Sequence, residues 1–599
     1  MSIDNHYLQP LLAPRSIALL GASNRYESVG EMMVRQLIEV GFPGELYPVN
    51  PRYEEVGGLK CYGSLGELPA SVELAVLNLA GHRIEAAMTE AIERGIKAFV
   101  IFDPCQLDDD PAPGLIERIR AIARESGVAI CGGNGMGYSN FDAKCFVGMW
   151  VQPPHPAGSV SLIAHSGSVF MFANADAPNY FNLSVSAGQE LGTSMDEYMD
   201  YALAMPSTRA IALFAETIRN PQGFRDSLAK AREQQVPVVV CKLGRTEAAA
   251  RQAFSHTGAI AGDSEAFDAL LDHYDALRVD TLDQLLCAAT LLASPRKPPP
   301  DGGFALFTDS GGLCGLAADR AEAFGVEFPS ITRETCQNLK ALMPLTTPAN
   351  PFDATLVASS DFRATYREAF GLMASDPNVS LFCVDSFADD RYDSRFSTGE
   401  AALDVFAGTD KPMFLISTYT GFPNGRLMQK SHEAGAPFVF GIDNALAAAR
   451  CFLDYHRRLS KTKAPVMVAD DAVVTRWRDI LANTRVLGEH QSLSLFQAFG
   501  VPVVESEVAQ SSAELRDAAE TLGYPVALKT AAKDIHHKSD VDGVVLGLKD
   551  ADELEVAYES LSSRLGPKVL VSAMADQGVE LALGMFTDPT AGPVVVVGP

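Results

Sequence analysis

The sequence lacks the features that mark several classes of protein. Its ten cysteines include no C-x-x-C pair, which argues against a zinc site, an iron–sulfur site and a disulfide framework. No apolar stretch reaches the ~20 residues that span a bilayer. The segment Met1–His6 has no charged start followed by an apolar core, so we expect no secretory signal and a cytoplasmic location.

Positive charge is also scarce. The 599 residues include 48 Lys and Arg against 75 Asp and Glu, which gives a formal net charge of −27. This balance argues against a nucleic-acid partner and against binding to an anionic membrane. A hydrophobic fraction of 47% excludes disorder for the bulk of the chain. The length predicts roughly three to five domains.

The first part of the chain, residues 16–146, alternates short apolar runs with helical patterns. We expect strands at 16–20, 45–49, 74–79, 98–102 and 128–131, and helices near 31–40, 82–94 and 112–126. This alternation is typical of a doubly wound parallel α/β fold, in which ligands bind beyond the carboxyl ends of the strands.

Two further units follow, separated by the Pro-rich linker Ser294–Gly303. We expect strands at 159–163, 210–214 and 237–242 in one unit, and at 304–308, 381–385 and 412–416 in the other. The two units are predicted to be variants of one architecture, an internal duplication at the level of the fold. The last region, from about 470, mixes helices with β-rich segments.

The first strand runs into the turn Gly21-Ala-Ser-Asn-Arg-Tyr-Glu-Ser-Val-Gly30, which precedes a helix. Such a turn presents backbone N–H groups to a phosphate, although it could also serve packing alone. It is not G-x-G-x-x-G, and the second strand ends in Tyr47-Pro-Val-Asn-Pro51 without a carboxylate for a ribose. NAD is therefore disfavoured.

One histidine lies in a loop of small residues, Ser255-His-Thr-Gly-Ala-Ile-Ala-Gly262. Small residues let the backbone approach an anion and let a loop move, and such an imidazole can act as a nucleophile towards phosphorus or a carbonyl carbon. Taken by itself, the loop fits a structural histidine better than a nucleophile.

Two Ser-Gly turns between a strand and a helix change this balance. They are Ala164-His-Ser-Gly-Ser168 and Thr308-Asp-Ser-Gly-Gly312. Two helix N-termini could converge on a phosphoryl group, each with roughly half a positive charge. Glu216 follows a strand end and could fix the tautomer of the imidazole, or it could be a surface carboxylate. A serine-hydrolase role for Ser166 is weaker, because His-Ser-Gly is not a G-x-S-x-G elbow.

Five motifs together resemble the ADP-forming (NDP-forming) acyl-CoA synthetases, a family related to succinyl-CoA synthetase. They are Tyr47–Pro51, Ser255–Gly262, Asn350-Pro-Phe-Asp353, Gly523-Tyr-Pro-Val-Ala-Leu-Lys529 and His537-Lys-Ser-Asp540. The resemblance implies a Rossmann-like CoA-binding domain at 8–146, flavodoxin-like ligase domains at 155–294 and 303–456, and an ATP-grasp domain from 475. We expect this chain to contain only the N-terminal part of that last domain, 475–599.

The resemblance implies an acid–CoA ligase that uses ATP, Mg²⁺ and coenzyme A, and releases ADP and phosphate. An acyl phosphate and a phosphohistidine would be its intermediates, with His256 as the carrier and Glu216 as its partner. The implied phosphate cradle is Ser166, Gly167, Ser168, Ser310, Gly311 and Gly312. The implied CoA site is Gly21, Ala22, Ser23, Asn50, Pro51 and Arg52, where Arg52 could instead be a solvated surface residue.

For the nucleotide, the resemblance implies Lys529 on the phosphates and His537 as a second carrier, although His537 could instead be a solvated loop histidine. Magnesium ligands would lie beyond residue 599, and we expect a homodimer. Two departures from the family pattern are Gly132-Gly-Asn-Gly135 and Asp542-Gly543. Two other functions stay open: CoA ligation coupled to a later elimination step, and a CoA-binding regulatory protein without ligase activity.

Overall fold

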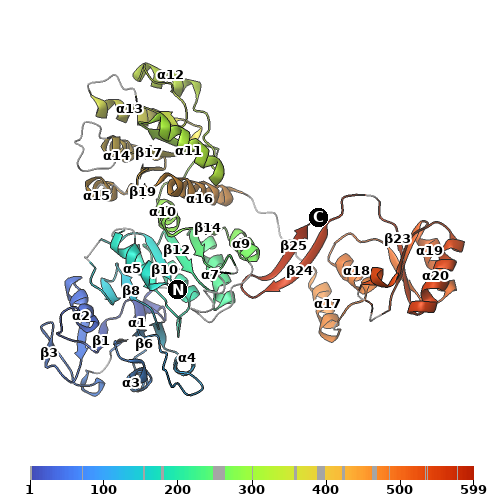
Figure 1. Ribbon diagram of the computed structural model, residues 1–599, viewed down its shortest axis with the longest axis horizontal. Coiled ribbons are helices and arrows are strands. Elements are labelled where there is room, and N and C mark those ends of the chain that lie inside the picture. Colours follow the sequence, from blue (N-terminus) through green and yellow to red (C-terminus); the bar gives the residue numbers. More distant parts are fainter. Residues whose placement is uncertain are drawn as a thin grey trace. The chain divides into compact units, whose positions relative to one another are not determined.

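Parallel α/β sheets make up most of the chain, as the alternating apolar runs predict, and an antiparallel region follows them (Figure 1). The computed structural model describes residues 3–69, 72–152, 156–176, 181–246, 248, 264–299, 301–355, 361–386, 398–420, 425–461, 469–484, 486–532, 535, 537–576 and 578–598. Contacts divide the chain into two compact units, Met1–Lys461 with Met585–Val595, and Thr462–Gly584 with Val596–Pro599.

The first sheet has five parallel strands in the order β2-β1-β5-β6-β7. Its elements are β1 (Ser16–Leu20), β2 (Glu45–Val49), β5 (Leu74–Leu77), β6 (Ala98–Ile101) and β7 (Ala129–Gly132), with α1 (Gln9–Leu12), α2 (Val29–Glu39), α3 (Gly81–Glu93), α4 (Leu115–Ser126) and the small hairpin β3 (Glu55–Val56) and β4 (Leu59–Lys60). A parallel bridge from Val49 to Tyr62 stands in the place of one more strand. When this bridge is counted as a strand, the strand order of the first sheet is that of the Rossmann fold.

The second sheet has the order β14-β13-β12-β10-β11-β8-β9. Its elements are β8 (Gly137–Asn140), β9 (Cys145–Gly148), β10 (Val160–Ala164), β11 (Phe181–Ser186), β12 (Ala210–Ala215), β13 (Val238–Lys242) and β14 (Leu277–Arg278), with α5 (Gly167–Asp176), α6 (Met195–Ala204), α7 (Pro221–Glu233), α9 (Ser264–His273) and α10 (Leu282–Leu292).

The third sheet has the order β16-β15-β17-β18-β19. Its elements are β15 (Gly303–Thr308), β16 (Phe352–Asp353), β17 (Val379–Asp385), β18 (Met413–Ser417) and β19 (Phe438–Phe440), with α11 (Gly311–Phe324), α12 (Arg333–Leu342), α13 (Phe362–Ser375), α14 (Thr398–Gly408), α15 (Gly425–Glu433) and α16 (Ile442–Ser460).

The parallel strands of the second and third sheets follow one chain order. Numbered within its own unit, each sheet reads 2-1-3-4-5, the order of the flavodoxin fold. The predicted duplication is therefore confirmed at the level of topology. In this order, successive strands are added first on one side of strand 1 and then on the other. The switch point therefore lies between strands 1 and 3, and ligands of such folds bind there.

The chain segments on either side of the second sheet's polar strands connect it to the first sheet. The hairpin β8–β9 pairs antiparallel with β11 and so continues the second sheet. The segment after β11 runs along β7, where the N–H groups of Gln189 and Leu191 donate to the carbonyls of Gly133 and Gly132, each at 2.8 Å. Side chains from both sheets also share one hydrophobic core.

The second compact unit is built on an antiparallel sheet with the order β20-β23-β21-β22. Its elements are β20 (Ser506–Ala509), β21 (Val526–Thr530), β22 (Val544–Leu548) and β23 (Val569–Ala573), with α17 (Asp471–Asn483), α18 (Glu489–Ala498), α19 (Ser512–Leu522) and α20 (Ala551–Leu565). A separate hairpin, β24 (Ala582–Asp588) and β25 (Gly592–Gly598), follows it. Among the described residues, no helix combines the length and the apolar character that crossing a membrane requires.

Substitution of Gly188 tests the contact between the first two sheets. It has φ +60°, and a Cβ built on it would lie 2.2 Å from the Gly133 carbonyl oxygen. Gly127 is a matched control, because it has φ +67° with open space around a built Cβ. We expect Gly127→Ala to cost about 1 kcal/mol through backbone strain alone, and Gly188→Ala to cost about 1–3 kcal/mol more through the clash. Calorimetric midpoints that fall equally in both variants would contradict this.

Candidate active site

The predicted CoA-binding residues come together at the carboxyl ends of β1 and β2. The Asn50 side-chain amide donates to the Ala22 carbonyl at 2.7 Å, and the Arg52 N–H donates to the Asn50 Oδ1 at 3.0 Å. Gly21 has φ +83°, and a Cβ there would lie 2.2 Å from the Asn78 carbonyl oxygen at the end of β5. The neighbouring ends of β1 and β5 form the switch point of this sheet. Arg52 and Pro51 are exposed beside it.

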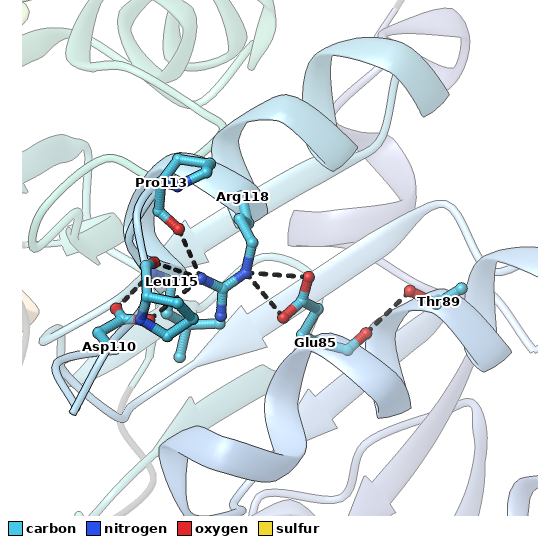
Figure 2. Close-up of polar contacts among 7 residues, drawn as sticks. Glu85, Thr89, Asp110, Pro113, Leu115 and Arg118 are labelled. Carbon is cyan, nitrogen blue, oxygen red and sulfur yellow. Dashed lines mark hydrogen bonds and ion pairs between the residues drawn. The ribbon is translucent and has the colours of Figure 1, made fainter.

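An arginine fixes the loop between β6 and α4 at the same edge of the sheet. Figure 2 shows the Arg118 guanidinium between Glu85 of α3 and the loop, with 3.0 Å to a Glu85 oxygen, 3.0 Å to Asp110 Oδ1 and 2.6 Å to the Pro113 carbonyl. The other Asp110 oxygen accepts the Leu115 N–H at the start of α4. That bond, followed by the charge of Arg118, holds the pKa of Asp110 below its usual value.

The departure Gly132–Gly135 has a steric reason. A Cβ at Gly133 would lie 2.6 Å from the Asp103 carbonyl oxygen, and one at Gly135 would lie 2.7 Å from the Ser186 carbonyl oxygen. The Asn134 N–H also donates to the Asp103 carbonyl at 3.2 Å. This turn packs between the loop after β6 and the end of β11, and larger side chains would separate them.

Four residues with polar side chains lie in a row at the carboxyl edge of the second sheet, one for each of the neighbouring strands β13, β12, β10 and β11, and Glu216 takes part through its backbone. They are Lys242, Glu216, His165 and Glu190, and we call them the edge row. The Lys242 ammonium donates to the Glu216 carbonyl at 3.0 Å. The Glu216 N–H donates to His165 Nδ1 at 3.0 Å, and His165 Nε2 lies 3.0 Å from Glu190 Oε1.

All residues of the edge row except Lys242 are buried. His165, Glu190 and Glu216 are 3%, 5% and 7% exposed. Glu190 Oε1 also accepts the Met195 N–H at 2.6 Å, and Glu190 Oε2 lies 3.3 Å from Arg219 Nε. The buried carboxylate thus has a hydrogen-bond donor at one oxygen and a cation beside the other, partners that a charge in a low-dielectric interior requires.

The resemblance implies Glu216 as the partner of His256, and the structure places Glu216 in the interior. Glu190 and Arg219 were not predicted. The one available signal for Glu190 is weak, an acidic residue four positions after the end of the buried strand β11. His165 stands in the turn Ala164–Ser168, and the sequence motif alone indicates no role for its side chain. His256 lies outside the described residues, so its distance from Glu216 is not part of this geometry.

The two predicted cradle turns differ in charge. Ser166 directly follows the edge row, and its hydroxyl lies 3.0 Å from that of Ser168 at the start of α5. The second turn starts α11, where Ser310 Oγ accepts the Leu313 N–H at 3.4 Å, with Gly311 and Gly312 in the first turn of the helix.

Carboxylates surround this second turn. A Cβ on Gly311 would lie 2.7 Å from Asp353 Oδ2. Asp385, at the end of β17, accepts hydrogen bonds from Thr308 and Thr418. Burial raises the pKa of Asp385 to about 6, and burial also raises the pKa of Asp309. A phosphoryl dianion at the second turn would face these carboxylates. Beside the first turn, the edge row combines the carboxylates Glu216 and Glu190 with the cation Lys242.

In the second compact unit, Lys529 of β21 pairs with a residue that the sequence analysis missed. The Lys529 ammonium lies 2.7 Å from Glu489 Oε1, and the Lys538 ammonium contacts the other oxygen. Burial favours a raised pKa for Glu489, but the two lysines outweigh it and hold the pKa below its usual value. His537 is exposed and directly precedes Lys538.

The described part of the chain contains no group of three or more His, Cys, Asp or Glu side chains that could hold a metal ion. No described residue is therefore assigned to Mg²⁺.

Three families match separate stretches of the chain. Residues 15–140 match a CoA binding domain, 157–292 a succinyl-CoA ligase like flavodoxin domain, and 480–599 an ATP-grasp domain. A trans-feruloyl-CoA synthase from an unknown prokaryotic organism is 28% identical over 99% of this chain and 86% of its own length. The ADP-forming acetate–CoA ligase I of Archaeoglobus fulgidus is also 28% identical, over the same shares.

A solved structure shares the fold. It is the dinucleotide forming acetyl-coenzyme A synthetase 1 of Ca. Korarchaeum cryptofilum in complex with phosphate and ADP. The match has a TM-score of 0.67 and 22% identity, and it covers 76% of this chain and 99% of that one.

Lys242 should titrate near neutral pH. Burial, followed by the positive charge of Arg278, lowers its pKa from 10.5 to about 8, against the opposing effect of Glu216. A group with a lowered pKa loses its proton as the pH rises through 8, so we expect acetic anhydride to label Lys242 with a midpoint near pH 8 in competitive labelling read by mass spectrometry.

The variant Arg278→Gln tests whether the charge of Arg278 contributes to the lowered pKa of Lys242. Removing that positive charge should move the labelling midpoint of Lys242 to higher pH. A midpoint near 10.5 in the unmodified protein, or one that stays in place in the variant, would contradict the assigned cause.

Proposed function

Because the chain is related along almost its whole length to ADP-forming acyl-CoA synthetases, we propose that it joins an organic acid to CoA with cleavage of ATP. The products are the acyl-CoA thioester, ADP and phosphate. The observation that supports this most directly is the edge row, which places a buried carboxylate at the switch point of the sheet whose next loop contains His256.

The reaction divides into three transfers. A nitrogen of His256 takes the γ-phosphoryl group of ATP, the bond to the β-phosphate oxygen breaks, and ADP leaves. A carboxylate oxygen of the acid then takes the phosphoryl group from the histidine and becomes an acyl phosphate. The CoA sulfur finally attacks the acyl carbon, phosphate leaves, and the thiol proton goes to solvent. Each step relies mainly on positioning and charge stabilisation.

On this proposal Glu216 orients the imidazole of His256 and stabilises the positive charge that develops on the ring as its free nitrogen attacks the phosphorus. The first cradle turn, 166–168, receives the phosphoryl group, with backbone N–H groups at the start of α5 as donors. Lys242 supports it from the end of β13, because its ammonium fixes the Glu216 backbone. The carboxylates around 310–312 make the second turn the less favourable of the two for a phosphoryl dianion.

The proposed CoA and ATP sites lie in different domains of the chain. CoA binds at Gly21–Ser23 and Asn50–Arg52 within 8–146, and the ligase domains are 155–294 and 303–456. ATP, as its magnesium complex, binds within 475–599, where Lys529 and Lys538 would exchange Glu489 for phosphate oxygens. The homodimer and the cytoplasmic location stay predictions.

Phosphorylation of His256 can be measured directly. We expect the protein to take up acid-labile, base-stable label from γ-³²P-ATP and Mg²⁺, and His256→Ala to abolish it. Glu216→Gln should slow labelling by about 10²-fold, because it removes the charge that orients and stabilises the imidazole.

His537→Ala separates the two predicted carriers. Label that survives in His256→Ala and disappears in the double variant would assign a phosphate to His537. Undiminished labelling in both single variants and in the double variant would reject both histidines.

The acid itself is found by measuring loss of the CoA thiol. Acetate and ferulate, the acids of the two relatives named above, should be compared with branched and dicarboxylic acids. One methylene changes recognition by about 10–200-fold, so we expect one class to exceed the others by at least about tenfold. Thiol loss must require ATP and acid together. CoA binding without thiol loss for any acid would favour the regulatory alternative.

A further inference from the structure

His165 connects two functional parts of the second sheet. It directly follows β10 and directly precedes Ser166 of the first cradle turn. Its own N–H donates to the Phe214 carbonyl at 3.2 Å, and its Nδ1 accepts the Glu216 N–H at 3.0 Å. One residue therefore ties the start of the turn to the backbone of Glu216.

The hydrogen bonds determine the state of this imidazole. Because Nδ1 accepts an N–H, it has no proton of its own, and the ring hydrogen of the neutral form lies on Nε2. Nε2 lies 3.0 Å from Glu190 Oε1, close enough for an ion-pair contact but without the geometry of a hydrogen bond. The hydrogen bond at Nδ1 holds Glu216, and Glu190 packs against the other side of the ring.

Glu190 is itself held on several sides. It adopts φ +51°, accepts the Met195 N–H at 2.6 Å and lies beside Arg219. A buried charged pair is poor evidence for stability, since well-packed apolar residues often stabilise a fold equally well. A buried chain of His165, Glu190 and Arg219 is thus better explained by the geometry it imposes than by the stability it adds.

We propose that His165 is a positioning residue for phosphoryl transfer, which it serves by holding Glu216 and the 166–168 turn in register. This rests on the proposed function, in which Glu216 orients His256. A displacement of about 1 Å in such a group can cost about 10²-fold in rate. The bond to the Glu216 N–H is the contact that matters, and the contact to Glu190 secures it.

Two amide variants separate these contacts. In His165→Asn, Oδ1 is as many bonds from the backbone as Nδ1 and can still accept the Glu216 N–H. In His165→Gln, the amide reaches the position of Nε2 and the acceptor for Glu216 is lost. Both side chains are polar and smaller than or close to histidine in size, so the comparison does not depend on a cavity or an apolar substitution.

We expect His165→Asn to form phosphoenzyme from γ-³²P-ATP within about tenfold of the unmodified rate, and His165→Gln to be about 10²-fold slower. His6 supplies a matched control. It is 4% exposed, its Nδ1 accepts the Leu8 N–H at 3.1 Å and its Nε2 lies 3.1 Å from Asp200. His6→Asn and His6→Gln should label at equal rates.

Equal labelling rates in the two His165 variants, at any level, would overturn the positioning role, as would a faster rate in His165→Gln. A difference of the same size between the two His6 variants would also overturn it, because the effect would then belong to buried histidines in general. Failure of the unmodified protein to take up label is a different result. It would overturn the proposed function itself and the role of His165 with it.

Discussion

Backbone hydrogen bonds along the edge of the first sheet set the geometry on which the site depends. The segment after β11 donates to the carbonyls of Gly132 and Gly133, and the Thr193 N–H adds a bond to the Ile130 carbonyl at 3.2 Å. Gly188 permits this approach because it has no Cβ to meet the Gly133 carbonyl. Glu190 lies within this segment, so the first sheet decides where the end of the edge row stands.

The row then follows from parallel topology. Polar residues after neighbouring parallel strands meet at one edge, even where they are far apart in the sequence. His165 and Glu190 follow β10 and β11, while Glu216 and Lys242 belong to β12 and β13, in the order of the strands in the sheet. The fold thereby brings residues from four separate segments together, and burial makes the hydrogen bond between His165 and the Glu216 N–H costly to break.

Strands with an apolar sequence are easier to predict than strands that form only by pairing with a neighbour. The buried strand β1 has the predicted bounds, because Ile17–Leu20 is a continuous apolar run that ends at the turn residue Gly21. The hairpin β8–β9 and the strand β11 have polar or mixed sequences, and they become strands by pairing with a neighbour rather than through their own pattern.

Some site residues could likewise be predicted from the sequence and others could not. The meeting of Gly21–Ser23 with Asn50 and Arg52 could be predicted, because adjacent parallel strands bring their following turns together. Glu190 and Glu489 could not, since a carboxylate after a strand or at a helix start is usually solvated. What distinguishes them is a partner from another element: His165 for Glu190, and Lys529 and Lys538 for Glu489. Such pairs exist only in three dimensions.

The duplication of the ligase fold extends to topology but not to charge. A chain with a net charge of −27 must hold phosphates through local groups, because its summed field repels them. The second sheet sets the cations Lys242 and Arg219 beside the carboxylates Glu216 and Glu190 at its edge, whereas the third places Asp309, Asp353 and Asp385 around its own switch point. Burial already resists ionisation of Asp385, and a dianion beside it would resist ionisation further. The same strand order can therefore surround two equivalent turns with different charge, mixed in one unit and acidic in the next. On the proposed function, this difference favours the turn at 166–168 over the turn at 310–312 for a phosphoryl dianion.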